Sequence, residues 1–565
     1  MKLNIILLNL IALISGEQLF LDPIPYHSIP VNGTKGGVSA DSAECSKLGL
    51  EILKVGGNAI DSSITTTLCQ GLIYPFASGI GGGGFMLVKL ANDSSYFINF
   101  REMAPKLSNS TMFKKANDSL LGGLAVGIPG EIKGLEVAHQ LFGKLSWKRV
   151  LEPVINLARY GYKVTKQLEL RLKRNEGYIR TMAGLNSTYV NKDNSLAAEG
   201  QVLKRKSLAN TLEQISIHGS KAFYQGPIAE AMVKSVQSNG GILQLEDLDK
   251  YKVEVVPALK AKFLNHDIHF LPPPASGIVA YHALKILENL NKPELDIDVV
   301  LKMVEAFKFA YVGRLNLGDP NFNNLGEAIK NILNENGIKR EYERIEKLDI
   351  TQEPKFYVDF KEQGFKEDHG TSHVSIIDKD RMSVSVTSTI NTDFGSKLLD
   401  LETGILFNNE MDDFSNPSFS NFFGFPPSKE NFVEPYKRPQ SSMTPIILSN
   451  SDKLLSIGAS GGSRIITSVV QSVFFHTALK LKLNAAIDTP RFHHQLLPNS
   501  LRVENNSLSD AAFAKLKVFN HTVIITERSE SVVNAVEVSF KKEKCKGTLV
   551  TAVTDKRKDG IAAAY

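Results

Sequence analysis

The stretch HGTSHVSIIDKDRMSVSVTST, His369 to Thr389, lies in the second half of a 565-residue chain. From His373 onward polar and apolar residues alternate, which is typical of strands with one face in a core. An internal threonine such as Thr371 is a poor nucleophile, and its simplest interpretation is a residue that starts a strand. A cut just before Thr371 would give it a free α-amine, which can act as a base beside its own hydroxyl. Gly370 leaves room for that hydroxyl to reach the preceding carbonyl.

The composition of the whole chain is that of an ordinary globular protein. Hydrophobic residues make up 42% of it and charged residues 22%, which excludes the disordered and fibrous classes. The net charge of +5, from 65 basic and 60 acidic residues, is small for this length and gives no support to a nucleic-acid partner. The basic cluster Lys541–Lys546 is interpreted as a solvated loop.

Helical and strand-like patterns are mixed along the chain without an internal repeat, which predicts a mixed α and β protein with a layered sheet core. Three-to-four-residue apolar spacing predicts helices over residues 125–143, 147–161 and 299–315. Strand patterns cover residues 85–90, 95–100, 373–389 and 454–460. The least regular region, residues 339–370, is polar and charged, and we expect it to tolerate a cut.

The N-terminal residues MKLNIILLNLIALISGEQ have the layout of a secretory signal peptide, with Lys2 before an apolar stretch from Leu3 to Ile14. A helix of that stretch would be about 18 Å long, short of the roughly 30 Å hydrocarbon core of a membrane. We therefore expect residues 1–16 to be removed and the protein to be secreted. The alternative is an uncleaved anchor on the outer cell surface. Glycan acceptor sequons agree with a secretory route and lie at Asn32, Asn92, Asn109, Asn117, Asn186, Asn505 and Asn520.

The three cysteines of the chain are too few for a disulfide scaffold. The segments 42–55 and 60–72 have helical spacing and are separated by a Gly-Gly-Asn-Ala turn. If they form an antiparallel hairpin, Cys45 near the start of the first helix lies level with Cys69 near the end of the second. This arrangement permits a Cys45–Cys69 disulfide and leaves Cys545 as an odd thiol. Three unpaired buried thiols are the alternative.

Two glycine-rich segments have the composition of anion-binding turns. Residues 78–90, SGIGGGGFMLVKL, contain a GxGxxG pattern but follow a helix and open a strand, which is the wrong order for a dinucleotide fold. Residues 454–475 have the order strand, Gly461-Gly462 turn and helix, whose backbone N–H groups favour negative charge. A structural turn, a phosphate cradle without the P-loop lysine, and an oxyanion hole all remain open for this second segment.

The segment FNNEMDDF, Phe407 to Phe414, groups the carboxylates of Glu410, Asp412 and Asp413. Acidic clusters are commonly solvated turns, and this one lacks EF-hand spacing. Its apolar neighbours favour partial enclosure, which would require a cationic partner such as a bound ammonium. Arg101, after the strand at residues 95–100, is by itself interpreted as a surface ion-pair residue. The histidines show no metal-ligand spacing and no GxSxG elbow occurs, so we predict neither a metal site nor a cofactor.

Taken together, these segments closely resemble the γ-glutamyltransferases (γ-glutamyl transpeptidases). The resemblance runs from about Gly36 to Tyr565 and is weakest over residues 339–368. The blocks that carry it are NFREMAP, GIGGGGF, TSHVSIIDKDRMSVSVTSTIN, GILFNNEMDDFS, KRPQSSMTP, GASGGSRIIT and PRFHHQ. It implies an N-terminal nucleophile hydrolase with a four-layer αββα sandwich. It also implies a precursor that cuts itself between Gly370 and Thr371 into a large chain, residues 17–370, and a small chain, residues 371–565, which stay together as a heterodimer.

The resemblance also implies a role for individual residues. Thr371 matches the nucleophile and Thr389 the residue that hydrogen-bonds to its hydroxyl. The oxyanion-hole glycines match Gly461 and Gly462. The groups that hold the α-carboxylate of the substrate match Arg101, Ser441 and Ser442. Those that hold its α-amine match Asn391, Glu410 and Asp413. The pair Cys45 and Cys69 resembles a family disulfide.

The activity implied by the resemblance is cleavage of the γ-glutamyl amide of glutathione and related compounds through an ester on Thr371. Amino acids, dipeptides or water would then accept the γ-glutamyl group. Two alternatives differ in class: an acylase specialised for another side chain, and a secreted binding protein that kept the fold without activity. The complete set of matching residues argues against both.

Overall fold

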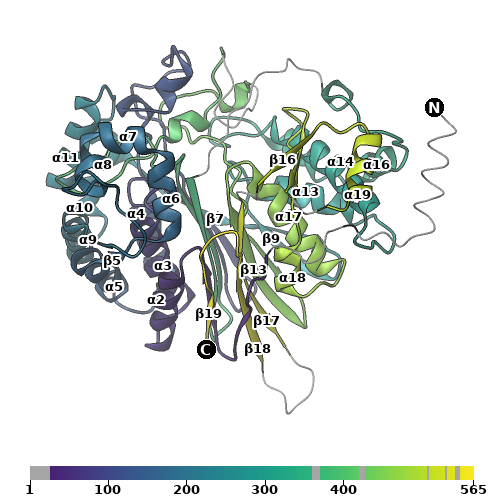
Figure 1. The fold of residues 1–565 in the computed structure, drawn as a ribbon, viewed down its shortest axis with the longest axis horizontal. Coiled ribbons are helices and arrows are strands. Elements are labelled where there is room, and N and C mark those ends of the chain that lie inside the picture. Colours follow the sequence, from purple (N-terminus) through teal and green to yellow (C-terminus); the bar gives the residue numbers. More distant parts are fainter. Residues whose placement is uncertain are drawn as a thin grey trace.

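Two stacked sheets form the centre of the molecule, and helices cover both outer faces (Figure 1). The computed structural model describes residues 19, 26–358, 370–418, 427–505, 508–527, 531–540 and 548–565. The expected signal segment, Cys545 and the basic cluster at Lys541–Lys546 lie outside the described residues. The mixed α and β architecture predicted from the sequence is confirmed, as is its four-layer αββα order.

Each central sheet has seven strands, and neighbouring strands in both sheets are antiparallel. The first sheet has the order β19 (Ala563–Ala564), β2 (Gly37–Ala40), β10 (Gly370–Ile377), β11 (Ser383–Asn391), β3 (Gly83–Lys89), β4 (Ser95–Phe100) and β7 (Glu254–Pro257). The second has the order β1 (Val31–Gly33), β18 (Leu549–Thr554), β17 (Val532–Ser539), β13 (Lys453–Ser460), β12 (Ile446–Ser449), β9 (His266–Phe270) and β8 (Leu259–Phe263). One small sheet pairs β5 (Tyr162–Lys163) with β6 (Val202–Leu203), and another has the order β14 (Phe492–His493), β15 (Leu501–Glu504) and β16 (Val523–Thr526).

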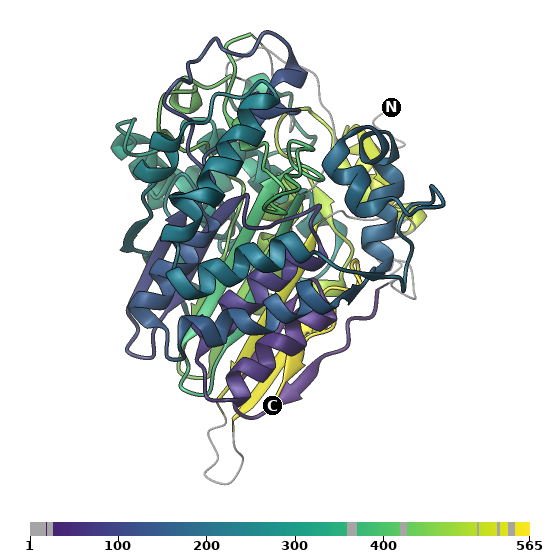
Figure 2. The same cartoon turned by 90° about the vertical axis from the view of Figure 1, so that its left-hand side faces the viewer.

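The helices form two outer layers, of which the first faces the viewer in Figure 2. That layer contains α2 (Ala43–Lys54), α3 (Ala59–Ile73), α4 (Glu131–Phe142), α5 (Trp147–Tyr160), α6 (Lys166–Arg174), α7 (Glu176–Thr181), α8 (Ala183–Tyr189), α9 (Lys206–His218), α10 (Lys221–Tyr224), α11 (Pro227–Ser238) and α12 (Leu245–Lys250). The opposite layer contains α13 (Gly277–Leu287), α14 (Ile297–Arg314), α15 (Gly326–Ile332), α16 (Glu335–Glu346), α17 (Arg464–Thr477), α18 (Leu483–Asp488) and α19 (Asp510–Val518). Among the described residues, no helix is both long and apolar enough to cross a membrane.

Alternation along β10 separates an apolar face from a polar one. Val374 and Ile376 pack in the core beneath the first helical layer, whereas Ser375 donates a hydrogen bond to the carbonyl of Asn534 in the second sheet (3.0 Å). His373 lies on the same face as Ser375 and contacts the hydroxyl of Thr387 (2.8 Å). Burial lowers the pKa of His373 to about 3, so the ring is neutral. Hydroxyl and imidazole groups therefore lie between the two sheets where most sandwiches place apolar side chains, and the Ser375 hydroxyl links the sheets directly.

Two predicted element boundaries are wrong, and each has a physical cause. The helix expected from residue 125 begins only at Glu131, because Ile128 before Pro129 is extended and pairs with Met103. The region expected to be irregular from residue 339 is helical to Glu346 in α16. Ile338 and Ile345 of α16 are buried, and their packing stabilises a helix whose other positions are mostly charged.

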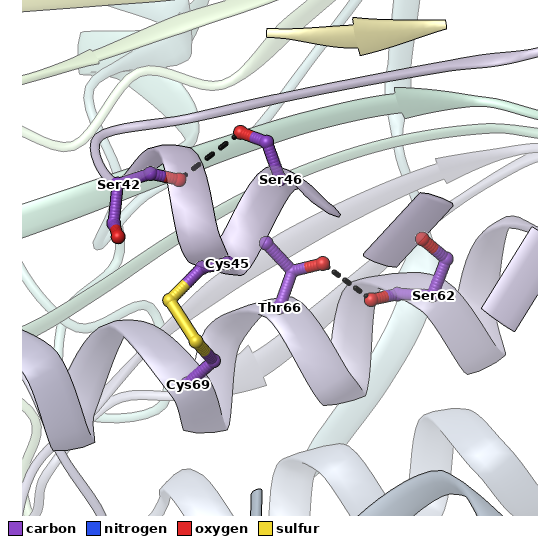
Figure 3. The surroundings of a disulfide bond; sticks show 6 residues. All are labelled: Ser42, Cys45, Ser46, Ser62, Thr66 and Cys69. Carbon is purple, nitrogen blue, oxygen red and sulfur yellow. Dashed lines mark hydrogen bonds between the residues drawn. A yellow bond between two sulfur atoms is a disulfide. The ribbon is translucent and has the colours of Figure 1, made fainter. Parts of the chain in front are cut away.

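The predicted disulfide between Cys45 and Cys69 is present and joins α2 to α3 (Figure 3). The two Cα atoms are 5.4 Å apart, within the range that a disulfide spans. Asn58 begins α3 with a capping box, in which its side chain accepts from the backbone N–H of Asp61. The sharp turn before that cap brings the two helices antiparallel, as the hairpin argument requires.

Replacing Cys45 and Cys69 by alanine should destabilise the folded protein. The bond closes a segment with a sequence separation of 24, for which loop-closure entropy gives about 3 kcal/mol. Urea unfolding of the double variant under non-reducing conditions measures this loss. Cys545→Ser is the control and should unfold at the wild-type midpoint; equal midpoints for all three proteins would contradict the prediction.

Candidate active site

The antiparallel pairing of β10 with β11 places Thr371 opposite Thr389. The register shifts between Gly370 and Thr371, so an irregularity in the ladder lies at the predicted cleavage bond. Thr371 is 7% exposed. Thr389 donates its hydroxyl hydrogen to the Gly370 carbonyl oxygen, and the same hydroxyl oxygen accepts from the backbone N–H of Asn391 (2.8 Å). The hydroxyl of Thr389 is therefore directed at the carbonyl of the bond that precedes Thr371.

The glycine-rich turn before β3 allows β11 and its neighbours to come close. A Cβ atom on Gly82 would lie 2.0 Å from the carbonyl oxygen of Thr389, and one on Gly81 would lie 2.1 Å from that of Leu406. No side chain fits at either distance. This segment, which the sequence excluded as a nucleotide loop, instead serves close packing around Thr389.

Arg101 is buried and ion-paired, contrary to its interpretation as a surface residue. It is 1% exposed, and its two terminal nitrogens donate separately to Glu410 and Asp413. Its Nε and Nη2 atoms also donate to the carbonyls of Pro439 and Gln440, both at 3.3 Å. Although burial lowers the pKa of Arg101, the surrounding carboxylates raise it above its ordinary value, so the guanidinium stays charged.

The acidic segment is enclosed, as its apolar neighbours suggested, and Arg101 is its cationic partner. Glu410 to Asp413 form a short 3₁₀ helix whose start is held by Asn408. The side-chain oxygen of Asn408 accepts from the backbone N–H groups of Glu410 and Gly127, both at 2.9 Å. Burial raises the pKa of Glu410, and Arg101 opposes that effect. The Arg101 guanidinium therefore balances the charge of these enclosed carboxylates.

Ser441 and Ser442, which together form the serine wall, line the same pocket as Arg101. The backbone N–H of Ser441 donates to the carbonyl of Pro274 (2.8 Å), and its carbonyl accepts from the hydroxyl of Ser276 (2.6 Å). One segment distant in the sequence, which contains Pro274 and Ser276, thus fixes the position of Ser441.

The turn between β13 and α17 has the order strand, turn and helix expected from the sequence. Gly461 has φ 125° and Gly462 has φ 58°, backbone conformations that residues with a Cβ rarely adopt. Gly462 borders the pocket that contains Thr371. The turn leads into a 14-residue helix, whose N-terminal N–H groups favour negative charge. The oxyanion-hole interpretation of this turn stays a prediction.

One pocket gathers side chains from segments more than 300 residues apart. It is lined by Arg101, Arg314, Thr371, Thr389, Asn391, Glu410, Asp413, Ser441, Ser442, Met443, Gly462, Ser463 and Ile465. Asn391 enters it with φ 74° and donates its side-chain amide to the carbonyl of Asn409 (3.0 Å). Gly370 and Gly461 adjoin the pocket as the sequence neighbours of Thr371 and Gly462. Arg314 was not predicted, because nothing around it in the sequence distinguishes it from any other helical arginine.

Two further carboxyl groups are buried near the base of the pocket. Glu102 lies 3.8 Å from Arg101, and burial raises its pKa to about 7 although Arg101 opposes the shift. Glu131 accepts a hydrogen bond from the hydroxyl of Ser388, the neighbour of Thr389. Burial raises the pKa of Glu131 to about 8, with a smaller contribution from Glu102. Glu131 therefore keeps its proton at neutral pH.

Solved structures of other proteins share this architecture. A cephalosporin acylase from Bacillus halodurans superimposes with a TM-score of 0.81 at 22% identity, covering 98% of this chain and 99% of that chain. The gamma-glutamyltranspeptidase of Helicobacter pylori matches with a TM-score of 0.52 at 29% identity, covering 53% of this chain and 89% of that chain. The four-layer αββα fold thus defines the class as N-terminal nucleophile hydrolase.

Sequence comparison narrows that class to one family. Residues 45–565 match the family model described as Gamma-glutamyltranspeptidase. The chain is also 37% identical over 553 residues to Glutathione hydrolase proenzyme 1 of Schizosaccharomyces pombe, covering 95% of this chain and 85% of that protein. The protein belongs to the gamma-glutamyltranspeptidase family.

Glu131→Gln should flatten the dependence of stability on pH. The folded protein keeps the Glu131 proton up to about pH 8, whereas an unfolded chain releases it near the ordinary value of 4.5. Between these values the folded state binds more protons, so this group makes stability fall as pH rises. Urea unfolding at about pH 5 and about pH 8 measures the difference. Exposed Glu230→Gln is the control, and a Glu131→Gln slope equal to that of the control would disprove the assignment.

Proposed function

We propose that the protein cleaves the γ-glutamyl amide of glutathione and related compounds and transfers the group to amino acids, dipeptides or water. The observation that carries the proposal is the pocket that joins Thr371 to the Arg101, Glu410 and Asp413 charge cluster. A γ-glutamyl group ends in a zwitterion, and this cluster offers a charge of each sign for it. The name of the Schizosaccharomyces pombe relative supports glutathione as the donor.

Maturation is proposed to begin in the uncut chain. The Thr371 hydroxyl attacks the carbonyl carbon of Gly370, and the peptide bond breaks as its nitrogen takes a proton to become the free α-amine. The resulting ester joins Gly370 to the Thr371 oxygen, and water hydrolyses it to free two chains. Thr389 supports this step, because its hydroxyl already donates to the Gly370 carbonyl oxygen, where negative charge develops.

Donor binding is proposed to use the paired charges of the pocket. Arg101, Ser441 and Ser442 would take the α-carboxylate, since a guanidinium grips a carboxylate with two parallel hydrogen bonds. Glu410, Asp413 and the Asn391 side chain would take the α-ammonium. The donor would thereby replace the direct contacts of Arg101 with Glu410 and Asp413 by contacts of the same kind. Its γ-carbonyl would be fixed near Thr371, which is catalysis by positioning.

Turnover is proposed to pass through an ester on Thr371. The Thr371 hydroxyl gives its proton to the α-amine of the same residue and attacks the γ-carbonyl carbon. The N–H groups of Gly461 and Gly462 would stabilise the oxyanion. The C–N bond then breaks, cysteinylglycine leaves with that proton, and water or an amine acceptor cleaves the ester.

Secretion, removal of residues 1–16 and glycosylation are part of the same proposal. Glycans are proposed at the six exposed sequon asparagines, Asn32, Asn92, Asn109, Asn117, Asn505 and Asn520. Asn186 is a poorer acceptor, because it is partly buried in α8 and donates its side-chain amide to the carbonyl of Arg180 (3.0 Å).

Thr371→Ala should leave the chain uncut and inactive. The purified wild type should give two bands on a denaturing gel, and the variant one band at full length, because alanine lacks the attacking oxygen. Thr371→Ser, which retains a hydroxyl, is the matched control and should still be cut. Normal cleavage of the alanine variant would show that another residue is the nucleophile. A wild type that stays uncut and releases nothing from a chromogenic γ-glutamyl amide would refute the enzyme itself.

Arg101→Lys should lower kcat/KM for a γ-glutamyl donor by roughly 10- to 100-fold, because lysine keeps the charge but loses the two-pronged grip on a carboxylate. Steady-state rates measure the loss. Arg149→Lys, on the exposed face of α5 where Arg149 pairs with Glu152, is the control and should behave as wild type. Wild-type kcat/KM in the Arg101 variant would remove Arg101 from the donor site.

A further inference from the structure

Arg314 is a second buried guanidinium of the pocket, and the proposed chemistry does not use it. It is the last residue of α14, is 5% exposed, and lines the pocket with Thr371 and Ser442. α14 belongs to the helical layer outside the second sheet (Figure 1), whereas Arg101 follows β4 of the first sheet. The two arginines therefore reach one pocket from opposite sides of the sandwich.

The last turn of α14 is bonded to two segments that shape the pocket. Arg314 donates from Nη2 to the hydroxyl oxygen of Ser442 (3.3 Å). Its backbone carbonyl accepts from the side-chain amide of Gln440 (2.8 Å). One turn earlier, Tyr311 donates its hydroxyl hydrogen to the carbonyl of Ser463 (2.6 Å). This turn thus fixes the serine pair and the start of α17 relative to each other.

Charge is distributed unevenly within the pocket. Arg101 contacts both Glu410 and Asp413, whereas Arg314 contacts the serine wall. Burial, with a smaller contribution from Arg101, lowers the pKa of Arg314 to about 10, although Tyr311 and Asp413 oppose the shift. At neutral pH the group is still a cation, and its place at the C-terminal end of a helix is favourable for positive charge. The serine wall therefore has a cation bonded to one of its two hydroxyl groups.

We propose that Arg314 is a positioning residue that makes the pocket select donors with a free α-carboxylate. Its guanidinium donates to the Ser442 oxygen, so the single hydrogen of that hydroxyl is left to donate to a carboxylate oxygen. Its charge also favours a carboxylate over a neutral amide at the same place. The inference rests on the proposed function, in which Arg101, Ser441 and Ser442 hold that carboxylate.

The test compares two donors that differ only at the α-carboxyl group: L-γ-glutamyl-p-nitroanilide and the same compound with its α-carboxylate converted to the carboxamide. The ratio of their kcat/KM values measures selection for the carboxylate. Arg314→Gln should lower this ratio roughly tenfold or more, through a higher KM for the free acid, because a buried charged contact is lost. Arg314→Lys, which keeps the charge, should restore part of the ratio. Arg149→Gln is the surface control and should leave it unchanged.

Both variants should still be cut at Gly370, because that step involves no donor carboxylate. Where the carboxamide donor turns over too slowly, L-glutamate and its α-amide are compared as competitive inhibitors. An unchanged ratio in an active Arg314→Gln enzyme overturns the inference and leaves the proposed function standing. An equal loss of kcat/KM on both donors, or insolubility of both variants, would show that Arg314 has a structural role. Either result would overturn the inference as well. A wild type that cleaves neither donor overturns both proposals.

Discussion

The antiparallel pairing of β10 with β11 is the constraint on which the rest of the site depends. β10 is enclosed by β2 and β11 within its sheet, by α3 on one face and by the second sheet on the other. A slip of one residue would exchange the apolar and polar faces and bury Val374 among hydroxyl groups. The register therefore fixes Thr371 in one position, near the start of β10 and opposite Thr389 of β11. Every other functional segment is arranged around that position.

Buried charge is the second constraint, and it accounts for the convergence of distant loops. A guanidinium as enclosed as that of Arg101 is tolerated only with carboxylates and carbonyls around it. Glu410 and Asp413 supply the carboxylates, and Pro439 and Gln440 supply the carbonyls. Removing one member would leave another charge buried without a partner, which typically costs about 3–5 kcal/mol. The proposed recognition of a zwitterion would thus use the same atoms that the stability of the buried cluster requires.

The sequence predicted local features well where one segment carries the signal. Strand 95–100 and the helix from Trp147 follow from periodicity, and the disulfide follows from the turn that pairs two helices. The αββα order of the four layers was predicted from the family resemblance, because no single sequence pattern indicates it. The burial of Arg101 could not be predicted locally, because its partners lie some 300 residues further along the chain. Arg314 was missed for the same reason: its contact with Ser442 exists only after α14 packs against α13 in the outer helical layer.

The order of strands has a consequence for the product of the proposed cut. β2 of the large chain lies between β19 and β10, which both belong to the small chain, and the carbonyl of Tyr565 accepts from the backbone of Thr34 and Lys35. In the second sheet, β1 of the large chain continues the ladder beyond β18 of the small chain. The two chains would thus be interleaved rather than docked. Separating them would mean breaking strand ladders in both sheets, so dissociation and unfolding would be a single event.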